Sequence, residues 1–248
     1  MDITDKLSFS HKDRKDLYDY VESHGTVRKD EARRALNMEP GAFGVHTTIL
    51  RQEGYVREVG NRLQIAYQEE EPREYDADGV SFVIRTAQQD DQEKLTRTIR
   101  EVAEEGEYFE AETVAEVLDH EEVLIRHNDV HSRLFFVACV GDDDDEVAGW
   151  VHLDLPETEF LSHTAVLTVG LRDDYRGNGI GSALLERGVE WARDHGFEKL
   201  YNSVPETNER AISFLEDHGW ETEAVRTGHY KIDGDYVDEL MMAVDLTA

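Results

Sequence analysis

An arginine and three glycines stand at close spacing between an apolar run and a helical pattern. The segment reads YRGNGIGS and holds Arg176, Gly177, Gly179 and Gly181, directly after the apolar run 165–171. Glycines let the backbone approach a ligand closely, and the N–H groups at a helix N-terminus favour an anion. The spacing therefore predicts a site for a phosphate-bearing ligand.

Two common phosphate loops do not fit this segment. A Walker A loop needs a lysine directly before its Ser or Thr, whereas Gly181 precedes Ser182. A dinucleotide-binding fingerprint needs glycine at position 182 and an acid ending the next strand, and the run 199–204, KLYNSV, holds no acid. The remaining pattern is Arg-x-x-Gly-x-Gly between a strand and a helix.

A second segment, ETNERAISFLEDHGW, contains Asn208, Ala211, Gly219 and Trp220. Together with the glycine loop it resembles the GNAT superfamily of acetyltransferases, and the resemblance extends from Ser81 to the C-terminus. It implies a mixed α/β (α+β) fold with a central, mostly antiparallel twisted sheet flanked by helices. It also implies acetyl-CoA as co-substrate and an N-acetyltransferase activity, in which an amine attacks the acetyl thioester within a ternary complex.

The resemblance further implies which residues bind the cofactor. The loop would hold the pyrophosphate, Asn208 would reach the pantetheine arm, and strand N–H groups would stabilise the charged carbonyl oxygen. The expected cofactor residues are Val169, Leu171, Arg176, Gly177, Asn178, Gly179, Ile180, Gly181, Ser182 and Asn208. An alternative role for Asn208 is to cap the helix that follows it.

Acid and base groups are harder to place. Many family members use a tyrosine at the position of Leu215, and often a glutamate at the position of Ala165 or Val166. Two substitutes are available as catalytic residues, His163 as base and Tyr230 as acid. The alternatives are a solvent-exposed histidine at a strand end and a tyrosine at the edge of the core.

The chain preceding these motifs has a different pattern. Three helical stretches, at 13–23, 28–38 and 41–54, are followed by two alternating runs around Gly60-Asn61, a hairpin signal. Residues 1–72 therefore resemble a winged helix-turn-helix domain. The alternative is a small helical module for docking or dimerisation.

In the winged-helix interpretation, residues 42–53 form the recognition helix and residues 59–62 the tip of the wing. The residues expected at DNA are Arg51, Arg57 and Arg62 at phosphates and His46, Thr47 and Thr48 near base edges. Residues 73–79 would be a linker and residues 80–248 the acetyltransferase domain.

Charge distinguishes the two halves. Residues 1–72 carry 11 Lys and Arg against 14 Asp and Glu, and the remainder 15 against 42, within a net charge of −30. With 19 Arg but 7 Lys, this diffuse acidity resembles that of halophilic archaeal proteins. We therefore interpret the acidity as an adaptation to salt rather than as a sign of the substrate.

No metal site is expected from the spacing of metal-binding residues. Cys139 lies in an apolar run, His127 and His131 lack a third ligand, and the acidic run 142–145 lacks the spacing of a calcium loop. The chain holds no signal peptide and no apolar run long enough to span a membrane, so a cytoplasmic protein is expected.

These patterns lead to two functional hypotheses. The first is an N-acetyltransferase that acts on a small-molecule or protein amine and carries a DNA- or partner-binding module. The second is a transcriptional regulator whose GNAT domain senses acetyl-CoA with little or no catalysis. Residues such as Glu105, Glu107 and Glu110 would favour a cationic acceptor, and an oligomer is compatible with either hypothesis.

Overall fold

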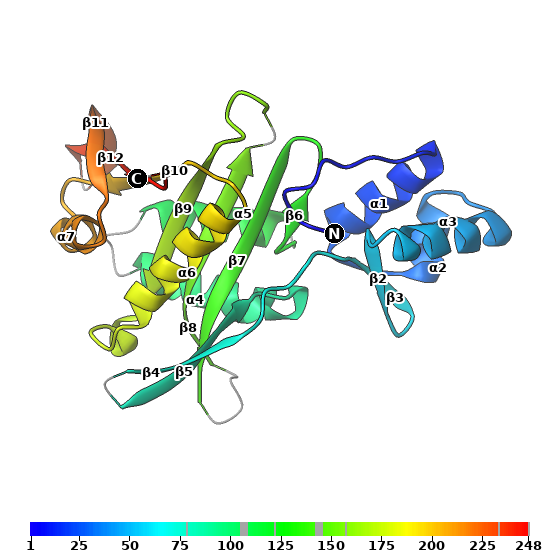
Figure 1. The fold of residues 1–248 in the computed structure, drawn as a ribbon, viewed down its shortest axis with the longest axis horizontal. Helices are drawn as coiled ribbons and strands as arrows, with labels where there is room; N and C mark the ends of the chain where they lie inside the picture. The colour runs from blue at the N-terminus through cyan, green and yellow to red at the C-terminus, as the bar shows by residue number, and fades with distance from the viewer. Residues whose placement is uncertain are drawn as a thin grey trace.

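The computed structural model describes residues 1–77, 79–104, 109–121, 123–141, 146–156, 158–232 and 234–247. Within this part of the chain, a small N-terminal unit lies beside a large sheet that is flanked by helices (Figure 1). The acidic run 142–145, the acids Glu105 and Glu107, and the side chain of Glu110 lie outside the described residues.

The N-terminal unit contains three helices and a three-stranded antiparallel sheet of order β1-β3-β2. Its elements are α1 (Lys12–His24), β1 (Thr26–Arg28), α2 (Lys29–Ala35), α3 (Pro40–Gln52), β2 (Val56–Val59) and β3 (Arg62–Ile65). Gly60 turns the hairpin with a φ of 59°, a conformation that favours glycine. The identification of this unit as a winged-helix domain stays a prediction.

Two side chains of the predicted DNA-facing set are buried. His46 and Thr47 pack inside the unit because they lie on the inner side of α3, beside Leu50 and Phe43. Thr48 is exposed, but its hydroxyl donates to the carbonyl of Gly44. The expectation that His46 and Thr47 approach base edges is therefore wrong.

Two of the three arginines predicted at phosphates form ion pairs with carboxylates. Arg51 lies 2.8 Å from Glu58, and Arg57 lies 2.6 Å from Glu69. Arg62 begins β3 and is exposed. A phosphate would have to compete with carboxylates for the first two side chains.

The large sheet has the order β11-β12-β10-β9-β8-β7-β5-β4, with β6 paired to β7. Its strands are β4 (Arg73–Ala77), β5 (Val80–Thr86), β6 (Arg126–His127), β7 (His131–Val140), β8 (Glu146–Pro156), β9 (Thr164–Leu171), β10 (Lys199–Pro205), β11 (Glu221–Ile232) and β12 (Asp235–Asp245). Every pair is antiparallel except β9 and β10, which run parallel. The predicted mixed fold with a mostly antiparallel sheet is confirmed.

Helices cover both faces of the middle strands. They are α4 (Gln92–Glu104), α5 (Phe109–Glu121), α6 (Ile180–Asp194) and α7 (Glu209–Asp217), with short 3₁₀ turns η1 (Gln89–Asp91) and η2 (Asp173–Tyr175). In Figure 1, α6 crosses in front of the sheet and α4 lies behind it.

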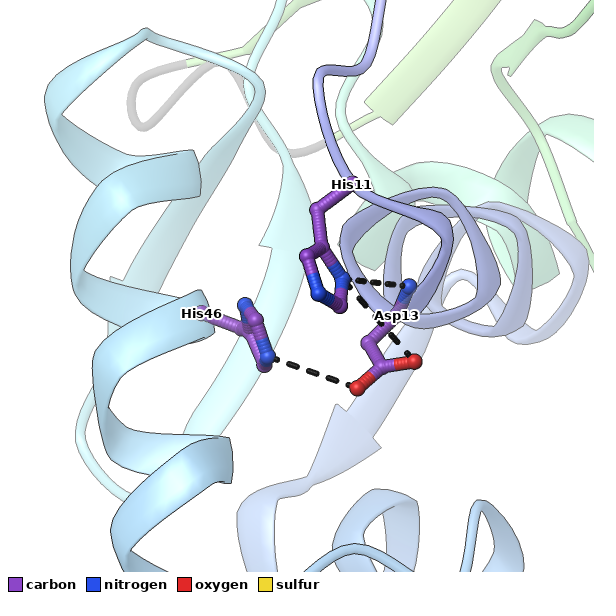
Figure 2. A group of neighbouring side chains, drawn as sticks. All are labelled: His11, Asp13 and His46. Carbon is purple, nitrogen blue, oxygen red and sulfur yellow. Dashed lines mark hydrogen bonds and ion pairs between the residues drawn. The ribbon is translucent and has the colours of Figure 1, made fainter.

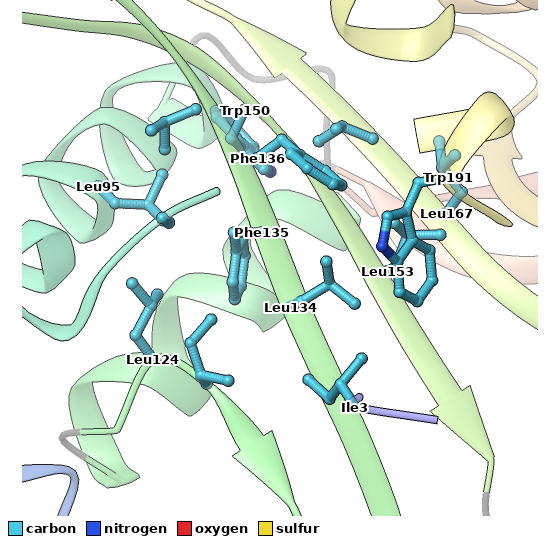
Figure 3. Packing of buried hydrophobic residues seen from close by; sticks show 14 of the residues in the cluster. Ile3, Leu95, Leu124, Leu134, Phe135, Phe136, Trp150, Leu153, Leu167 and Trp191 are labelled. Atoms are coloured by element: carbon cyan, nitrogen blue, oxygen red, sulfur yellow. The ribbon is translucent and has the colours of Figure 1, made fainter. Parts of the chain in front are cut away.

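The core follows the alternation of side chains along the strands. Figure 3 shows Phe135 on the face toward Leu95 of α4, whereas Leu153 and Leu167 lie toward Trp191 of α6. All five side chains are buried. The middle strands β7 and β8, which are buried along most of their length, thereby pack against a core on each face of the sheet.

Most of the predicted linker at 73–79 is a strand of the large sheet. Arg73–Ala77 forms β4 and pairs with β5 along its whole length, from Arg73 opposite Ile84 to Ala77 opposite Val80. Tyr75 stacks on Phe82 with ring centroids 5.1 Å apart, so an apolar contact fixes a segment whose polar composition suggested a free chain.

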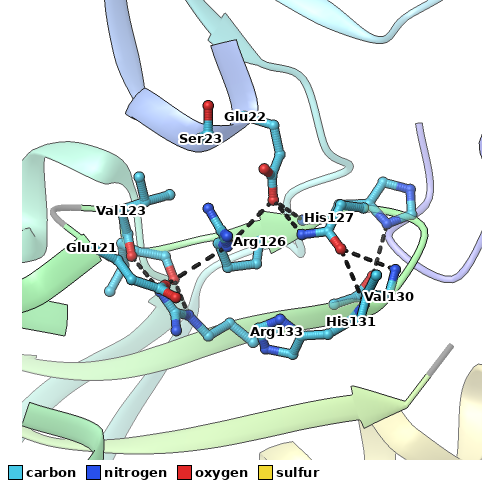
Figure 4. Close-up of polar contacts among 12 residues, drawn as sticks. Glu22, Ser23, Glu121, Val123, Arg126, His127, Val130, His131 and Arg133 are labelled. Atoms are coloured by element: carbon cyan, nitrogen blue, oxygen red, sulfur yellow. Dashed lines mark hydrogen bonds and ion pairs between the residues drawn. The ribbon is translucent and has the colours of Figure 1, made fainter. Parts of the chain in front are cut away.

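The N-terminal unit contacts the sheet through a buried polar cluster (Figure 4). Glu22 of α1 is 3% exposed and accepts hydrogen bonds from the Nδ2 of Asn128 at 2.9 Å and the backbone N–H of His127 at 3.2 Å. Its carboxylate also lies 3.4 Å from the Nε of Arg126. The Tyr18 hydroxyl donates to the carbonyl of His127 at 2.9 Å.

Among the described residues, no helix is both long and apolar enough to cross a membrane.

Candidate active site

A cleft of about 700 Å³ opens where β9 and β10 part. The two strands pair from Lys199 opposite Thr164 to Tyr201 opposite Val166, and beyond this point β10 pairs only with β12. The cleft is lined by Val102, Val169, Gly170, Leu171, Asp173, Arg176, Gly177, Gly179, Gly181, Ser182, Asn202, Val204, Asn208, Arg210, Ala211, Phe214 and Leu215. The predicted glycine loop and the Asn208 segment thus meet at one site.

The glycine loop has a backbone that other residues would strain. Gly177 and Gly179 have φ angles of 81° and 76°, and Gly179 is the N-cap of α6. The N–H groups in the first turn of a helix have no intrahelical acceptor. The loop therefore presents the positive end of α6 to the cleft, which suits a pyrophosphate.

Two predicted cofactor residues, Asn178 and Ile180, do not line the cleft. The side chain of Ile180 is fully buried in the core. These two predicted cofactor residues can contribute only through their backbone or from the rim.

Arg176 holds the loop in shape. Its Nε donates to the carbonyl of Leu171 at 3.0 Å, and its Nη1 lies 2.9 Å from the carboxylate of Asp173. Arg210 lies 3.8 Å from the same carboxylate and is mostly exposed. Two guanidinium groups thus stand at the loop end of the cleft, where a phosphate would be attracted.

Asn208 caps α7, as the alternative interpretation had it. Its side-chain oxygen accepts the N–H of Ala211 at 3.0 Å, and the residue is 7% exposed. Because it also lines the cleft, the amide end of the same side chain is placed on the wall beside Arg210 and Phe214.

Asn202 is a site residue that sequence reasoning missed. It follows Tyr201, where the β9–β10 ladder ends, and it is 3% exposed. Its Oδ1 is buried with no hydrogen-bond partner among the described residues. In the run KLYNSV it alternates with the apolar Leu200 and Val204, so a polar residue at an inward-facing position was the available signal.

The wall formed by β9 has no room for side chains at one position. A Cβ on Gly170 would lie 2.2 Å from the ring of Trp150, whose fully buried indole packs beneath it. Gly170 therefore has only backbone to present to the cleft, and Val169 and Leu171 line the cleft on either side of it. Stabilisation of a carbonyl oxygen requires backbone N–H groups at such a place.

The two proposed catalytic side chains are not at the cleft. His163 precedes β9 and is exposed, while the cleft begins six residues later at Val169. At about 3.3 Å per strand residue, this is a separation of about 20 Å. Tyr230 pairs with Val237 in the last hairpin and is not among the lining residues. The roles of His163 as base and Tyr230 as acid are not supported by these positions.

Within the described chain, the ionisable side chains that line the cleft are Asp173, Arg176 and Arg210. Behind the β9 wall, burial lowers the pKa of His152 to about 3, so its imidazole is neutral near pH 7. Its Nδ1 lies 3.3 Å from the hydroxyl of Thr168, and its Nε2 is buried without a partner among the described residues. The site can therefore bind and orient two substrates, but it has no evident strong acid or base.

A strand pair that parts over a glycine loop and a capped helix forms a groove suited to an extended, phosphate-bearing ligand. The acetyltransferase (GNAT) family model matches residues 96–220, which include this loop and the Asn208 segment. The match covers half of the chain, and the chain belongs to the GNAT acetyltransferase family. Members of this family use acetyl-CoA as co-substrate.

Curated relatives are similar over part of the chain. The spermidine N(1)-acetyltransferase of Escherichia coli K12 is 29% identical over 122 residues, which are 47% of this chain and 60% of that protein. The [ribosomal protein bS18]-alanine N-acetyltransferase of the same strain is 25% identical over 87 residues, 35% of this chain and 59% of that protein. The chain thus spans about three fifths of the length of each.

Solved structures share the fold. A GNAT-family acetyltransferase from Streptococcus pneumoniae aligns with a TM-score of 0.54 at 22% identity, over 66% of this chain and 99% of that one. A GCN5-related N-acetyltransferase from Kribbella flavida aligns with a TM-score of 0.53 at 21% identity, over 66% and 97%. About a third of this chain lies outside each alignment.

Proposed function

We propose that the protein is an acetyl-CoA-dependent N-acetyltransferase that transfers the acetyl group directly to an amine. The single observation that carries this proposal is the cleft itself, in which the glycine loop at α6, the parted edge of β9 and the Asn208 cap form one continuous wall. The pyrophosphate would lie at the loop and the pantetheine arm between β9 and β10. The thioester would then lie near the point where the strands meet.

The reaction would depend mainly on positioning. The ammonium form of the amine first loses a proton to solvent, and its nitrogen then attacks the thioester carbonyl carbon, whose oxygen gains charge. The C–S bond breaks, and a second proton of the amine passes to the leaving coenzyme A thiolate. Backbone N–H groups of β9 around Val169 and Leu171 would stabilise the oxygen. A thiol with an ordinary pKa of about 8.5 leaves as a thiolate without strong assistance. The reaction is therefore compatible with a cleft that has no evident strong acid or base.

A cationic amine is the acceptor class we propose. The two curated relatives are named for spermidine, a polyamine, and for an alanine of ribosomal protein bS18. The spermidine acetyltransferase aligns over the larger share of this chain, 47% against 35%, so we place a polyamine first.

The test is to incubate the full chain with acetyl-CoA and a panel of acceptors, and to identify acetylated products by mass spectrometry. The panel contains spermidine, a peptide that begins with alanine and a lysine-containing peptide with a blocked N-terminus. Acetylation of spermidine above both peptides supports the proposal. If acetyl-CoA binds but none of the three acceptors is acetylated, the result contradicts the enzymatic function.

A regulator that senses acetyl-CoA is the second candidate function. It is favoured by one observation, the lack of any histidine, tyrosine or glutamate among the described residues that line the cleft. In this case residues 1–72 would bind DNA, with exposed Arg62 near the wing tip contributing a phosphate contact.

DNA binding is tested with the full chain by fluorescence anisotropy on duplex DNA at several salt concentrations. A phosphate-binding domain gives a logarithm of affinity that falls steeply with the logarithm of salt. An Arg62→Ala variant should then reduce the slope by about one. An absence of binding at low salt would leave the N-terminal unit as a docking module.

A further inference from the structure

We infer that the N-terminal unit contains a divalent transition-metal site, suited to zinc, formed by His11, Asp13 and His46. The three side chains come from two helices, since His11 is the N-cap of α1, Asp13 lies in the first turn of α1 and His46 lies in the middle of α3. One ligand atom of each side chain lies within 4.8 Å of the other two. This site is independent of acetyl transfer.

The distances suit a metal between the side chains. The Nε2 of His46 lies 3.5 Å from Oδ2 of Asp13. Two ligands bound to zinc at 2.0–2.1 Å in a tetrahedral arrangement lie about 3.3 Å apart, so this pair is already close to a metal-bound separation. The two imidazole rings have centroids 4.8 Å apart and are tilted by 35° (Figure 2).

His11 can complete the set by exchanging its capping contact for the metal. Its Nδ1 accepts the backbone N–H of Asp13 at 3.1 Å and lies 3.9 Å from Oδ1 of Asp13, so the lone pair that caps α1 already lies beside the carboxylate. A neutral imidazole has one nitrogen with a free lone pair, so a metal bound at Nδ1 replaces this hydrogen bond while Nε2 keeps its proton. Because His11 is exposed, its ring can move the remaining ångström or so toward Asp13 and His46.

His46 is held in position by burial. The residue is 9% exposed, its Nε2 lies 3.5 Å from Asp13, and the ring of His11 lies beside it. Its Nδ1, the ring nitrogen away from Asp13, has no hydrogen-bond partner among the described residues. A metal bound at Nε2 leaves the proton on Nδ1, so packing rather than an outer-shell hydrogen bond would orient this ring.

Two imidazole nitrogens and one carboxylate oxygen favour zinc over calcium or magnesium, which prefer oxygen ligands. A fourth position would be taken by water. Since the ligands lie on α1 and α3, a bound ion would connect these helices and stabilise the N-terminal unit.

Equilibrium dialysis of the full chain against Zn²⁺, with metal analysis, tests the site. One equivalent should bind, and the variants His11→Ala, Asp13→Asn and His46→Gln should each lose affinity about tenfold or more. His24→Ala is the matched control, because His24 is an exposed histidine at the other end of α1 and should leave binding unchanged. Co²⁺ should give the visible absorption of a four-coordinate site in the original chain and the control only.

Thermal unfolding guards against loss of the fold in a variant. Zn²⁺ should raise the unfolding temperature of the original chain and of His24→Ala, and should leave that of His11→Ala and Asp13→Asn unchanged. No bound zinc in the original chain overturns the inference. Binding that all the variants retain, or that His24→Ala loses equally, assigns the metal to other histidines and also overturns it.

Discussion

At the scale of single residues, the backbone of Gly179 decides how the cleft holds its ligand. Its φ of 76° would cost another residue about 1–2 kcal/mol of strain. Gly179→Ala should therefore displace the N-cap of α6 and weaken acetyl-CoA binding about tenfold, measured by calorimetry. Gly196→Ala is the matched control, since Gly196 has a φ of 82° at the other end of α6. An equal loss of affinity in both variants would contradict a direct role of the loop.

Asn202 gives a second prediction at this scale. We expect its buried, unpaired oxygen to accept an N–H from the pantetheine arm, a hydrogen bond worth about 1 kcal/mol. Asn202→Leu should raise the dissociation constant of acetyl-CoA about fivefold, while Ser203→Ala on the same strand should not change it. Equal or tighter binding by Asn202→Leu would show that this oxygen meets no ligand.

Local residue patterns bring most of the predicted cofactor residues to the cleft, but not the two predicted catalytic side chains. Gly179 and Asn208 stand in local motifs, whose spacing along the chain is enough to place them. His163 and Tyr230 are predicted from residue type near an expected strand, and only the three-dimensional sheet shows that one end of β9 lies far from the cleft. Asn202 and the His11–His46 pair depend on contacts between distant segments, which no local spacing encodes.

At the scale of elements, the entry to α4 depends on a carboxylate. Asp91 ends η1 and accepts hydrogen bonds from Arg85 at 2.6 and 2.8 Å and from the N–H of Gln88 at 2.7 Å. Burial alone would raise the pKa of Asp91, but the hydrogen bonds from Arg85 and Gln88 outweigh it and lower the pKa below its ordinary value of 3.8. The carboxylate therefore stabilises the fold above this value, and the contribution is lost as the pH falls through the lowered pKa.

Asp91→Asn should accordingly reduce the free energy of unfolding at pH 7, and the difference from the original chain should narrow as the pH falls below 3.8 and through the lowered pKa of Asp91. Urea unfolding at several pH values measures this. Asp90→Asn, at the exposed neighbouring position, is expected to have little effect. A difference that stays constant across the pH range would show that the charge of Asp91 is not the cause.

The sequence predicts an element correctly where its residue pattern is local. The prediction fails where pairing with another strand determines the structure. The strand Val80–Thr86 and the α6 face with Leu184 and Trp191 follow from alternation and helical spacing. Arg73–Ala77 has the composition of a linker, yet pairing with β5 and the stacking of Tyr75 on Phe82 make it a strand.

At the scale of the whole molecule, Glu22 connects the N-terminal unit to the sheet. Glu22→Ala should lower the free energy of unfolding by about 3 kcal/mol, because it leaves the partly buried Arg126 without one of its carboxylates and the His127 N–H without its acceptor. Asp129→Asn is the control, since it removes the exposed Lys15–Asp129 pair at the same interface and should cost less than about 1 kcal/mol. Chemical denaturation measures both free energies of unfolding. Similar losses in the two variants would contradict a stabilising role of the buried Glu22 cluster.

The net charge of −30 predicts a salt response of the whole chain. The Debye screening length falls from about 10 Å at 0.1 M to about 3 Å at 1 M salt, so repulsion among the acidic side chains of the folded state weakens. The unfolding temperature should rise between these concentrations of KCl, measured by calorimetry. A constant or falling unfolding temperature would contradict the interpretation of the acidity as an adaptation to salt.

The most direct test of the account is the rate at which the full chain releases coenzyme A thiol from acetyl-CoA, with and without a cationic amine. The cleft predicts release that depends on the amine, saturates with both substrates and falls in Gly179→Ala. Thioester that remains intact with every amine, while acetyl-CoA binds in the cleft, would contradict acetyl transfer and leave a sensor of the coenzyme.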